Sequence, residues 1–250
     1  TACGKDTNED NAETTGSQPV ESTETADTTE DKEEDDNKEE AAKEDMEISV
    51  VSREDGSGTR GAFIELTGLE EEDDKGEKVD NTTEEAIVQN STNGVMQTVS
   101  QDPTAIGYIS LGSLNDTVKA IKVDGVEATD ENIKAGKYNL QRPFNLAYKE
   151  AELDDLSKDF LAFCLSEQAE KIVEEEGYIP VEAQEYTPNE VEGTITVAGS
   201  TSVTPVMEKL IEAYKDVNPK ATIELQSTGS GAGIESTISG VSQIAMASRE

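Results

Sequence analysis

Apolar and polar side chains begin to alternate near residue 47, and the first structured segment is expected to start there. The pattern of Glu47-Ile48-Ser49-Val50-Val51-Ser52 has the period of a short β-strand. The strand leads into a glycine-containing segment at 53–60. Phe63 and Leu66 then lie at helical spacing, and Gly68 suits the C′ position that ends such a helix.

The middle of the chain is predicted to contain short elements separated by acidic loops. Residues 69–81 are rich in Asp and Glu and are expected to form an acidic loop around Gly76. The pattern favours a helix over Thr83–Asn90, followed by strands over Ala105–Leu111 and Val118–Val123.

A long amphipathic helix, or a pair of helices, is predicted between residues 153 and 177. Its apolar positions recur at helical spacing, and Gly177 suits its end. These positions are Leu153, Leu156, Phe160, Phe163, Ile172 and Val173. The segment 180–193, rich in Pro and Glu, is expected to be a connector.

The last segment is predicted to be a compact α/β unit. A helix is expected from Thr204, a good N-cap residue followed by Pro205 at the first helical position, and a second helix from about Ile234. Strands are expected over Thr194–Ala198, Ala221–Gln226 and Gln243–Ser248. The sequence stops two residues beyond the third strand, so we expect the chain to be truncated at that end.

Residues 1–47 contain almost no large apolar side chains and carry 18 acidic residues against 4 lysines. Such a segment cannot bury enough surface to offset its ordering entropy, so we expect a disordered, extended acidic tether, with an acidic interaction tail as the alternative. Thr1-Ala2-Cys3-Gly4 resembles the end of a bacterial lipoprotein signal peptide, in which small residues precede a lipidated Cys. Cys3 is therefore the expected lipid attachment site, whereas Cys164, in an apolar helical stretch, is expected to be a buried inert thiol.

The net charge of −36 argues against nucleic acid as a partner, because that affinity depends on Lys and Arg neutralising phosphates. The chain has no His, which rules out a Ser-His-Asp triad and His-based metal sites. No P-loop, nucleophile elbow or EF-hand-like loop occurs in the sequence. The many carboxylates fall in loops and in the tether, which is typical of a solvated surface. The sequence therefore predicts neither an enzyme nor a bound metal or cofactor.

Three strand-to-helix turns, at 53–60, 199–202 and 227–233, are rich in Gly, Ser and Thr. Glycine lets the backbone approach a ligand closely, and Ser and Thr add hydroxyl donors. The free N–H groups of a helix's first turn suit a tetrahedral oxyanion. Arg53 can add a two-pronged, charge-assisted grip, and Asp55 is expected to hold its guanidinium in position.

These turns carry a resemblance to a known family. Arg53-Glu54-Asp55-Gly56-Ser57-Gly58-Thr59 is similar to the R-x-D-G-S-G-T turn of the phosphate-binding proteins of phosphate ABC transporters, the PstS family. Ala105-Ile106-Gly107-Tyr108-Ile109 resembles its AIGY strand, and segments 198–206 and 226–233 resemble its two N-terminal glycine-rich turns. The resemblance covers residues 47–250 and implies a type-II periplasmic-binding-protein fold, in which two α/β lobes close on one phosphate.

The resemblance also implies a set of site residues. The phosphate-binding residues that it implies are Arg53, Ser57, Gly58, Thr59, Thr201, Ser202 and Ser230. Supporting roles are expected for Asp55, Ser248 and Arg249. The family places an acidic residue, which accepts the proton of hydrogen phosphate, where this chain has Arg249. Either sulfate competes with phosphate here, or Asp55 or Glu250 accepts that proton.

The order of the motifs is the reverse of the family's usual order, as in a circular permutation. Residues 48–142 would then form part of the lobe that carries the Arg53 turn, and residues 143–250 would build the second lobe. The lobe that carries Arg53 is expected to be incomplete, with its missing part following Glu250.

The resemblance implies an extracytoplasmic solute-binding protein, held by a lipid anchor on the outer face of a bacterial cell membrane. It would capture inorganic phosphate and pass it to the permease subunits of an ABC importer. Two alternatives stay open: a binder of sulfate or another tetrahedral oxyanion, and a cell-surface sensor or adhesin that reuses the fold.

Overall fold

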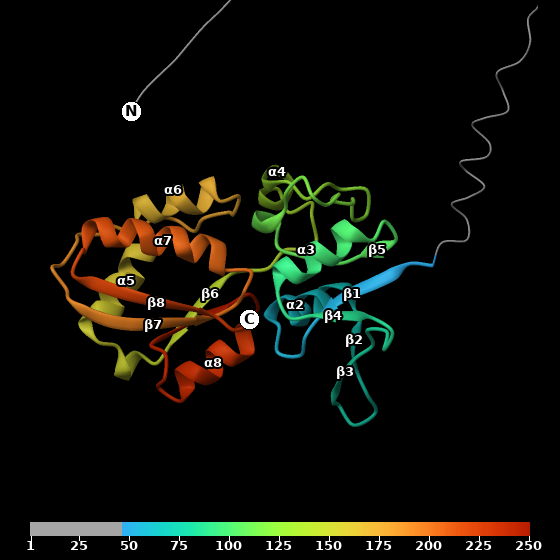
Figure 1. Cartoon of the computed structure of the whole chain (residues 1–250), viewed down its shortest axis with the longest axis horizontal. Helices are drawn as coiled ribbons and strands as arrows, with labels where there is room; N and C mark the ends of the chain where they lie inside the picture. The colour runs from blue at the N-terminus through green and yellow to red at the C-terminus, as the bar shows by residue number, and fades with distance from the viewer. Residues whose placement is uncertain (1–46) are drawn as a thin grey trace, which may run out of the picture. The chain divides into compact units, whose positions relative to one another are not determined.

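The computed structural model describes residues 47–250, which belong to one compact unit. The expected tether, apart from Glu47, and the lipidated Cys3 lie outside the described residues. The described chain builds two larger sheets, one in each half, of which the first is parallel and the second mixed, and a two-stranded hairpin (Figure 1). This agrees with the predicted α/β periplasmic-binding-protein-like class.

The first sheet has the strand order β4-β1-β5, and all of its pairings are parallel. Its central strand β1 (Ser49–Arg53) is flanked by β4 (Ile87–Gln89) and β5 (Ala105–Ile106). Parallel strands need a crossover between them, which the helices α2 (Gly58–Thr67) and α3 (Thr92–Gln101) help to provide. Both helices therefore begin at the same edge of the sheet, where β1 and β4 end.

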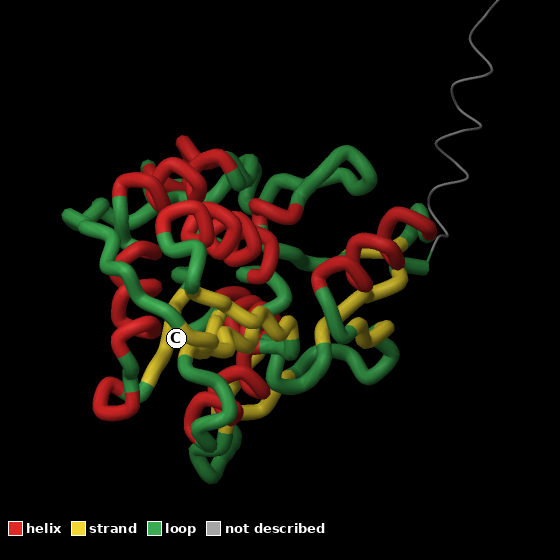
Figure 2. The backbone as a smooth tube through the Cα atoms, turned by 60° about the vertical axis from the view of Figure 1, so that its left-hand side comes forward, coloured by secondary structure: helices red, strands yellow, loops and turns green. Residues whose placement is uncertain are grey.

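The second sheet has the order β6-β9-β7-β8. Strands β7 (Gly193–Gly199), β8 (Ala221–Ser227) and β9 (Ile244–Ala247) are parallel, and β6 (Asn145–Tyr148) runs antiparallel to β9. The helices around it are α5 (Asp155–Cys164), α6 (Glu167–Glu175), α7 (Thr204–Val217) and α8 (Ser230–Ile238). Helix α7 lies on one face and α8 on the other (Figure 1), and Figure 2 shows helices on both sides of the strands.

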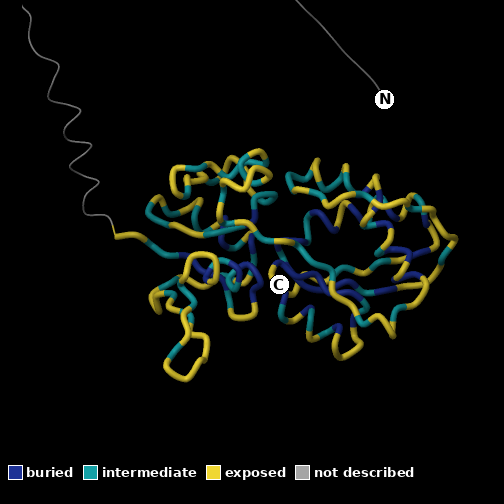
Figure 3. The backbone as a smooth tube through the Cα atoms, turned by 180° about the vertical axis from the view of Figure 1, so that it is seen from behind, coloured by how far each residue is buried: buried dark blue, intermediate teal, exposed yellow. Residues whose placement is uncertain are grey.

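The main hydrophobic core lies between the second sheet and helices α5 and α7. All four residues of β9 are buried, as expected for a parallel strand covered on both faces. Phe160 and Phe163 of α5 pack against Tyr214 of α7, with ring centroids 5.0 and 5.3 Å apart. Figure 3 shows the buried strands running through the interior, while the connecting loops are exposed.

One carboxylate, that of Asp159, is buried beside this core. Asp159, on α5, accepts hydrogen bonds from the hydroxyl of Tyr214 at 2.8 Å, the hydroxyl of Tyr186 at 3.0 Å and the side-chain amides of Asn189 and Asn218 at 2.7 and 2.9 Å. Burial, and then the hydrogen bond to this carboxylate, raise the pKa of the Tyr214 hydroxyl above its usual value. The four partners come from α7 and the loops beside it, so one side chain ties them to α5.

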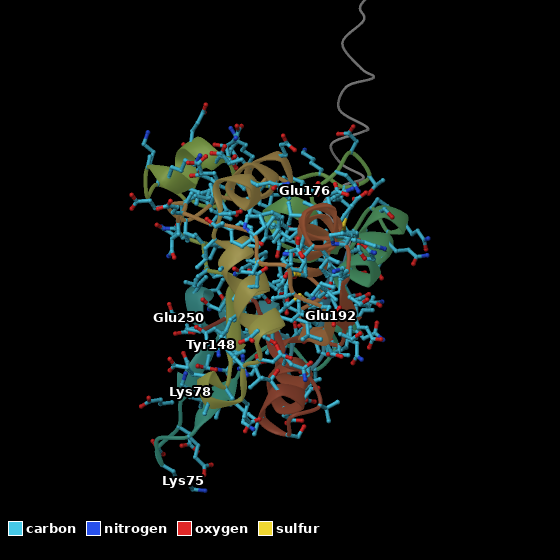
Figure 4. The ribbon with its side chains drawn as sticks, turned by 90° about the vertical axis from the view of Figure 1, so that its left-hand side faces the viewer. Lys75, Lys78, Tyr148, Glu176, Glu192 and Glu250 are labelled. Atoms are coloured by element: carbon cyan, nitrogen blue, oxygen red, sulfur yellow. The ribbon has the colours of Figure 1, made fainter. Side chains whose placement is uncertain are left out.

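The prediction of an acidic loop at 69–81 is only partly correct. The segment is a hairpin, β2 (Glu70–Glu72) and β3 (Lys78–Asp80), closed by a turn in which Gly76 has a φ of 77°. Lys78 pairs with Glu70 across the hairpin, at 2.6 Å, and offsets part of the repulsion between its acidic strands. Lys75, at the hairpin tip, points away from the body of the protein (Figure 4).

Three further predictions for the first half are wrong or too long. Residues 83–90 are not a helix, because Ile87 and Val88 pair with β1 as strand β4. Residues 118–123 form no strand and end in a tight turn between Val123 and Val126. The strand expected over 105–111 is limited to β5, and a 3-10 turn, η1 (Leu111–Ser113), follows. The pairing of Ile87 and Val88 with β1 is a tertiary contact, which the local sequence pattern does not predict.

The elements predicted for the second half and the first helix are confirmed, although two helix starts differ from the prediction. Gly68 has a φ of 72° and ends α2. The amphipathic segment predicted between residues 153 and 177 is the helix pair α5 and α6. The three strands predicted at the C-terminal end are present within two residues of the expected bounds. Helix α7 starts one residue earlier than expected, since Thr204 is its first residue and Val203 its N-cap. Helix α8 starts at Ser230 rather than near Ile234.

The remaining short elements are α4 (Asp130–Lys134) and the 3-10 turn η2 (Glu150–Glu152). Cys164, expected to be buried, is partly buried against the core, and burial raises the pKa of its thiol to about 12. Within residues 47–250, no helix combines the length and the apolar character that crossing a membrane requires.

We predict that Asp159→Ala lowers the free energy of unfolding by about 2–4 kcal/mol, because it leaves buried hydroxyl and amide donors without an acceptor. Urea unfolding followed by circular dichroism measures the change. Lys158→Ala, at the exposed neighbouring position, is the control and should change the stability by no more than about 0.5 kcal/mol. Equal losses in the two variants would show that the Asp159 cluster does not stabilise the core.

Candidate functional site

The first part of the site is the guanidinium of Arg53, which ends β1 and is 2% exposed. Its Nε and Nη2 donate to the two carboxylate oxygens of Glu54 at 2.8 and 2.9 Å, and Nη2 also donates to Oγ1 of Thr201 at 3.2 Å. The Tyr108 hydroxyl accepts from the Arg53 backbone N–H at 3.2 Å. A buried cation is therefore held in a fixed position and reaches from the first sheet to a turn of the second.

The expected role of Asp55 is wrong, because Glu54 holds the Arg53 guanidinium. The Asp55 side chain is 98% exposed and accepts a bond from Nη1 of Arg60 at 2.9 Å. Arg60 also pairs with Asp80 at 2.8 Å and donates to the backbone carbonyl of Arg53 at 2.8 Å. Both residues follow the end of β1. Glu54 lies within reach of the Arg53 guanidinium, whereas Asp55 points to solvent.

Helix α2 begins where two helices from different sheets meet. Ser57 is its N-cap and accepts a hydrogen bond from the Arg60 N–H at 3.3 Å. A Cβ at Gly58 would lie 2.9 Å from Oγ of Ser248 and closer still to Ser230, the first residue of α8. The Gly231 N–H also donates to the Gly56 carbonyl at 3.0 Å. Only glycine at position 58 allows the first turns of α2 and α8 to approach this closely.

A cluster of buried hydroxyl groups lies between the two sheets. Oγ1 of Thr59 is 2.9 Å from Oγ of Ser202, and Oγ1 of Thr92 is 3.2 Å from both Oγ1 of Thr201 and Oγ of Ser202. Oγ of Ser248 lies 3.4 Å from Oγ1 of Thr59. We call these five residues the hydroxyl cluster. Four of them come from three strand-to-helix turns or strand ends that the sequence singled out.

Thr92, at the start of α3, is a site residue that sequence reasoning missed. It stands in Ser91-Thr92-Asn93-Gly94, a fourth Ser-, Thr- and Gly-containing turn between a strand and a helix. Ser91 caps α3 by accepting from the Gly94 N–H at 3.0 Å. The erroneous helix at 83–90 concealed this turn, because it removed the strand that precedes it.

Arg142 is the second residue that sequence reasoning missed. Its Nη2 donates to Oγ1 of Thr59 at 2.9 Å and to Oγ of Ser110 at 3.0 Å. Arg142 also lines a cavity of about 1190 Å³, bordered mostly by apolar side chains such as Leu114 and Phe144. Desolvation in these surroundings, and then the charge of Arg53, lower the pKa of Arg142 to about 10.

The expected site residues at the end of β9 divide between the interior and the surface. Ser248 is fully buried, its N–H donates to Oγ of Ser230 at 3.2 Å, and its hydroxyl lies 2.9 Å from that of Ser200. Arg249 is exposed and lies beside Gly61 on α2, with its side-chain Cδ 3.5 Å from where a Cβ at Gly61 would be. Glu250, which Figure 4 labels, is exposed as well.

Helices α2, α3 and α8, together with the turn before α7, present their N-terminal ends to this region. The first N–H groups of an α-helix have no intrahelical partner and carry a partial positive charge, so they favour an anion. Two guanidinium groups and the hydroxyl cluster add donors of fixed geometry. The donor set therefore suits a small oxyanion, and within residues 47–250 no group of three or more carboxylates or thiols is placed to hold a metal ion.

Comparison with known proteins identifies the family. A model of the PBP superfamily domain matches residues 30–168 and 184–250. The phosphate-binding protein PstS 2 of Streptococcus agalactiae is 52% identical over 204 residues, which are 81% of this chain and 70% of that protein. The corresponding protein of Streptococcus pneumoniae is 48% identical over 206 residues, again 81% and 70% of the two chains. The chain belongs to the PstS family of phosphate-binding proteins.

Two solved structures support this membership. The phosphate-binding protein of a phosphate ABC transporter from S. pneumoniae has 47% identity and a TM-score of 0.62, with 81% of this chain and 79% of that chain covered. A substrate-binding protein from Clostridium perfringens, solved with bound phosphate, has 41% identity and a TM-score of 0.51, with 58% and 56% covered.

Membership of the PstS family confirms the resemblance and the prediction of a binding protein rather than an enzyme, since this is a non-enzymatic transport family. The permuted order of the motifs, the lobe boundaries at 48–142 and 143–250, and the individual ligand residues stay predictions.

The contact between α2 and α8 generates a stability prediction. Gly58→Ala should lower the free energy of unfolding by about 1–3 kcal/mol, because the added methyl group overlaps Ser230 and forces the two helix ends apart. Gly61→Ala, three residues along the same helix, meets only the flexible Arg249 side chain and should stabilise by up to about 1 kcal/mol. Chemical unfolding of both variants is the measurement, and an equal loss in the Gly61 variant would contradict the close approach at Gly58.

Proposed function

We propose that this protein captures inorganic phosphate from outside the cell and delivers it to the permease subunits of an ABC importer. The single observation that carries this proposal is the buried Arg53 guanidinium beside the hydroxyl cluster, at the converging N-terminal ends of helices from both sheets. Membership of the PstS family supports the same ligand, since two relatives that are 52% and 48% identical over the aligned residues are named phosphate-binding proteins.

The chemistry of the donors fits a tetrahedral oxyanion. Phosphate presents four oxygens that all accept hydrogen bonds. Arg53 can add a charge-assisted donor through Nη1, because its Nε and Nη2 are already bonded to Glu54 and Thr201. The residues proposed as ligands are Arg53, Ser57, Gly58, Thr59, Thr201, Ser202 and Ser230. Ser57 and Gly58 would contribute mainly backbone N–H groups at the start of α2, because the Ser57 hydroxyl already caps that helix.

A protein whose two lobes close around a ligand can deliver that ligand to a permease without catalysing a reaction. Contacts such as Thr59 to Ser202 join residues of the two sheets, so an anion that bonds both would favour the closed arrangement. Release would then require the lobes to open against the permease. Binding and delivery of this kind place the protein on the extracytoplasmic side of the membrane.

A lipid anchor at Cys3 is part of the proposal. The Ala2-Cys3-Gly4 segment has the small residues that precede and follow a lipidated Cys, and an acidic stretch follows it. Multiple acyl chains on one Cys give firmer membrane attachment than a single chain. The anchor would keep the binding protein close to its permease.

Arg53→Ala should weaken phosphate binding by about 1.5–3 kcal/mol, because it removes a charge-assisted bond to a buried anion. That is roughly a 10- to 150-fold rise in the dissociation constant, which isothermal titration calorimetry with inorganic phosphate measures. Arg249→Ala removes an exposed arginine and is the matched control, with an expected change below about threefold. Similar small effects of both substitutions would contradict the placement of the anion at Arg53.

Sulfate is the second candidate ligand, and the positions of the carboxylates favour considering it. Both oxygens of Glu54 are engaged by Arg53, and Asp55 is exposed and paired with Arg60. Glu54 is already paired with Arg53, and Asp55 and Glu250 are exposed, so the hydroxyl of Ser202 is the acceptor that we propose for the proton of hydrogen phosphate. Titration of sulfate against bound phosphate separates the two ligands: we expect phosphate to remain bound, and displacement by equimolar sulfate would overturn the choice of phosphate.

Cys3→Ala should move the full-length protein from the membrane fraction to the soluble extracytoplasmic fraction, with phosphate affinity unchanged. Fractionation of cells followed by immunoblotting measures the distribution. The control is Cys164→Ala, which removes the partly buried thiol of α5 and should leave the protein with the membrane. Retention of the Cys3 variant on the membrane would argue against lipidation.

A further inference from the structure

Arg142 lies where the chain passes from the first sheet to the second, three residues before β6 begins. Its Nη2 reaches Thr59, a member of the hydroxyl cluster, and Ser110 from the first half of the chain. The cluster continues from Thr59 to Ser202, and from there through Thr92 and Thr201 to the Arg53 guanidinium. A continuous row of hydroxyl groups thus connects two guanidinium groups.

The two cations differ in how their charges are balanced. Arg53 is paired with Glu54, and Arg60 nearby is paired with Asp55 and Asp80. Within residues 47–250, no carboxylate lies within ion-pair distance of Arg142. Arg142 therefore contributes a positive charge to the site that the described protein does not neutralise.

The surroundings of Arg142 make the unpaired positive charge of its guanidinium energetically unfavourable. Its Nε atom is buried and has no hydrogen-bond partner in the described structure, and its guanidinium lies 5.7 Å from the ring centre of Phe144. The other charged or titratable groups that face it are Arg53, Tyr108 and Tyr178. Arg53 is itself a cation, and burial raises the pKa of the Tyr178 hydroxyl, so neither of these two supplies a negative charge to Arg142. An arginine stays protonated even when desolvation lowers its pKa, so the charge persists.

We propose that Arg142 is a second anion-binding residue of this site and that the bound oxyanion is its counter-ion. The inference rests on the proposed function and deepens it. Arg142 supplies the charge that makes the site prefer a doubly charged oxyanion, such as hydrogen phosphate with two negative charges, over a singly charged one.

A purely structural role for Arg142 explains less. Joining Thr59 to Ser110 requires only a neutral donor, and a partly buried cation without a counter-ion carries a desolvation cost that a neutral amide would avoid. The unpartnered Nε is also a donor that neither Thr59 nor Ser110 satisfies. An anion beside Arg142 accounts for the charge and for the spare donor together.

The test is the pH dependence of phosphate binding by the full chain and by Arg142→Gln and Arg142→Lys. Calorimetry with inorganic phosphate is done one pH unit below and one unit above the second pKa of phosphate. The chain has no His, so the main group that titrates near the site in this range is the ligand. We expect the unmodified protein to bind more tightly at the higher pH. The phosphate affinity of Arg142→Gln should fall at least about tenfold at the higher pH but less than threefold at the lower pH.

Arg142→Lys keeps the positive charge and should keep the preference for the higher pH, with affinity within about tenfold of the unmodified protein. This variant decides the question if Arg142→Gln does not fold, as judged by thermal unfolding. A Lys variant that loses the pH preference, or a Gln variant that loses equally at both pH values, would overturn the counter-ion role. Absence of phosphate binding by the unmodified chain would instead contradict the proposed function, and this inference with it.

Discussion

Two helices that follow strands of different sheets meet at their first turns, and the arrangement of the site depends on this contact. Gly58 of α2 lies against Ser230 of α8, at a separation that any Cβ at position 58 would prevent. The approach brings Thr59 within 2.9 Å of Ser202, and Ser248 within reach of both helix ends. Because each of these hydroxyl groups belongs to a helix start, a strand end or the short turn between β7 and α7, their positions follow from the backbones of the two sheets. A small ligand therefore meets donors whose geometry is already fixed, which reduces the entropy that binding costs.

The arginines around the hydroxyl cluster differ in whether a carboxylate pairs with them. The protein as a whole is strongly acidic, with a net charge of −36. The acidic side chains near the Arg53 turn are used to fix arginines: Glu54 holds Arg53, and Asp80 holds Arg60 on the outside of the turn. Arg142 alone among these three arginines approaches the cluster without a carboxylate in the described chain. An acidic surface and an anion site are thus compatible, because the field inside the site is set by groups at hydrogen-bond distance and the surface carboxylates are screened by solvent.

Sequence reasoning identified the parts of the site that have a local signature. Glycine, Ser and Thr after a strand mark an anion-binding turn, and the turns that hold Arg53, Thr201 and Ser230 were all found in this way. Thr92 was missed because β4 is a strand only through its pairing with β1, and the preceding residues have no strand period of their own. Arg142 was missed because it has no local signature: it lies 83 residues from Thr59 along the chain, in a segment without regular structure. The Arg53 partner was assigned to Asp55 rather than Glu54 for a similar reason: β1 ends at Arg53, so strand alternation no longer applies to the next two residues, and the sequence alone does not show where β1 ends.

The two sheets differ in how much core stabilises them, and this difference connects binding with stability. The second sheet is covered on both faces and has a continuous buried core, whereas the first has three short strands, with Val88 58% and Ile106 42% exposed. Much of what holds the first sheet against the second is polar: the hydroxyl cluster, the Arg53 bond to Thr201 and the contacts of Arg142. An anion that neutralises Arg142 and accepts bonds from the cluster would strengthen the weaker part of the protein directly. Any ligand that binds the folded state alone stabilises it in proportion to the logarithm of its concentration. In this protein that stabilisation would act where the two sheets meet, so ligand binding and closure of the two halves depend on the same contacts.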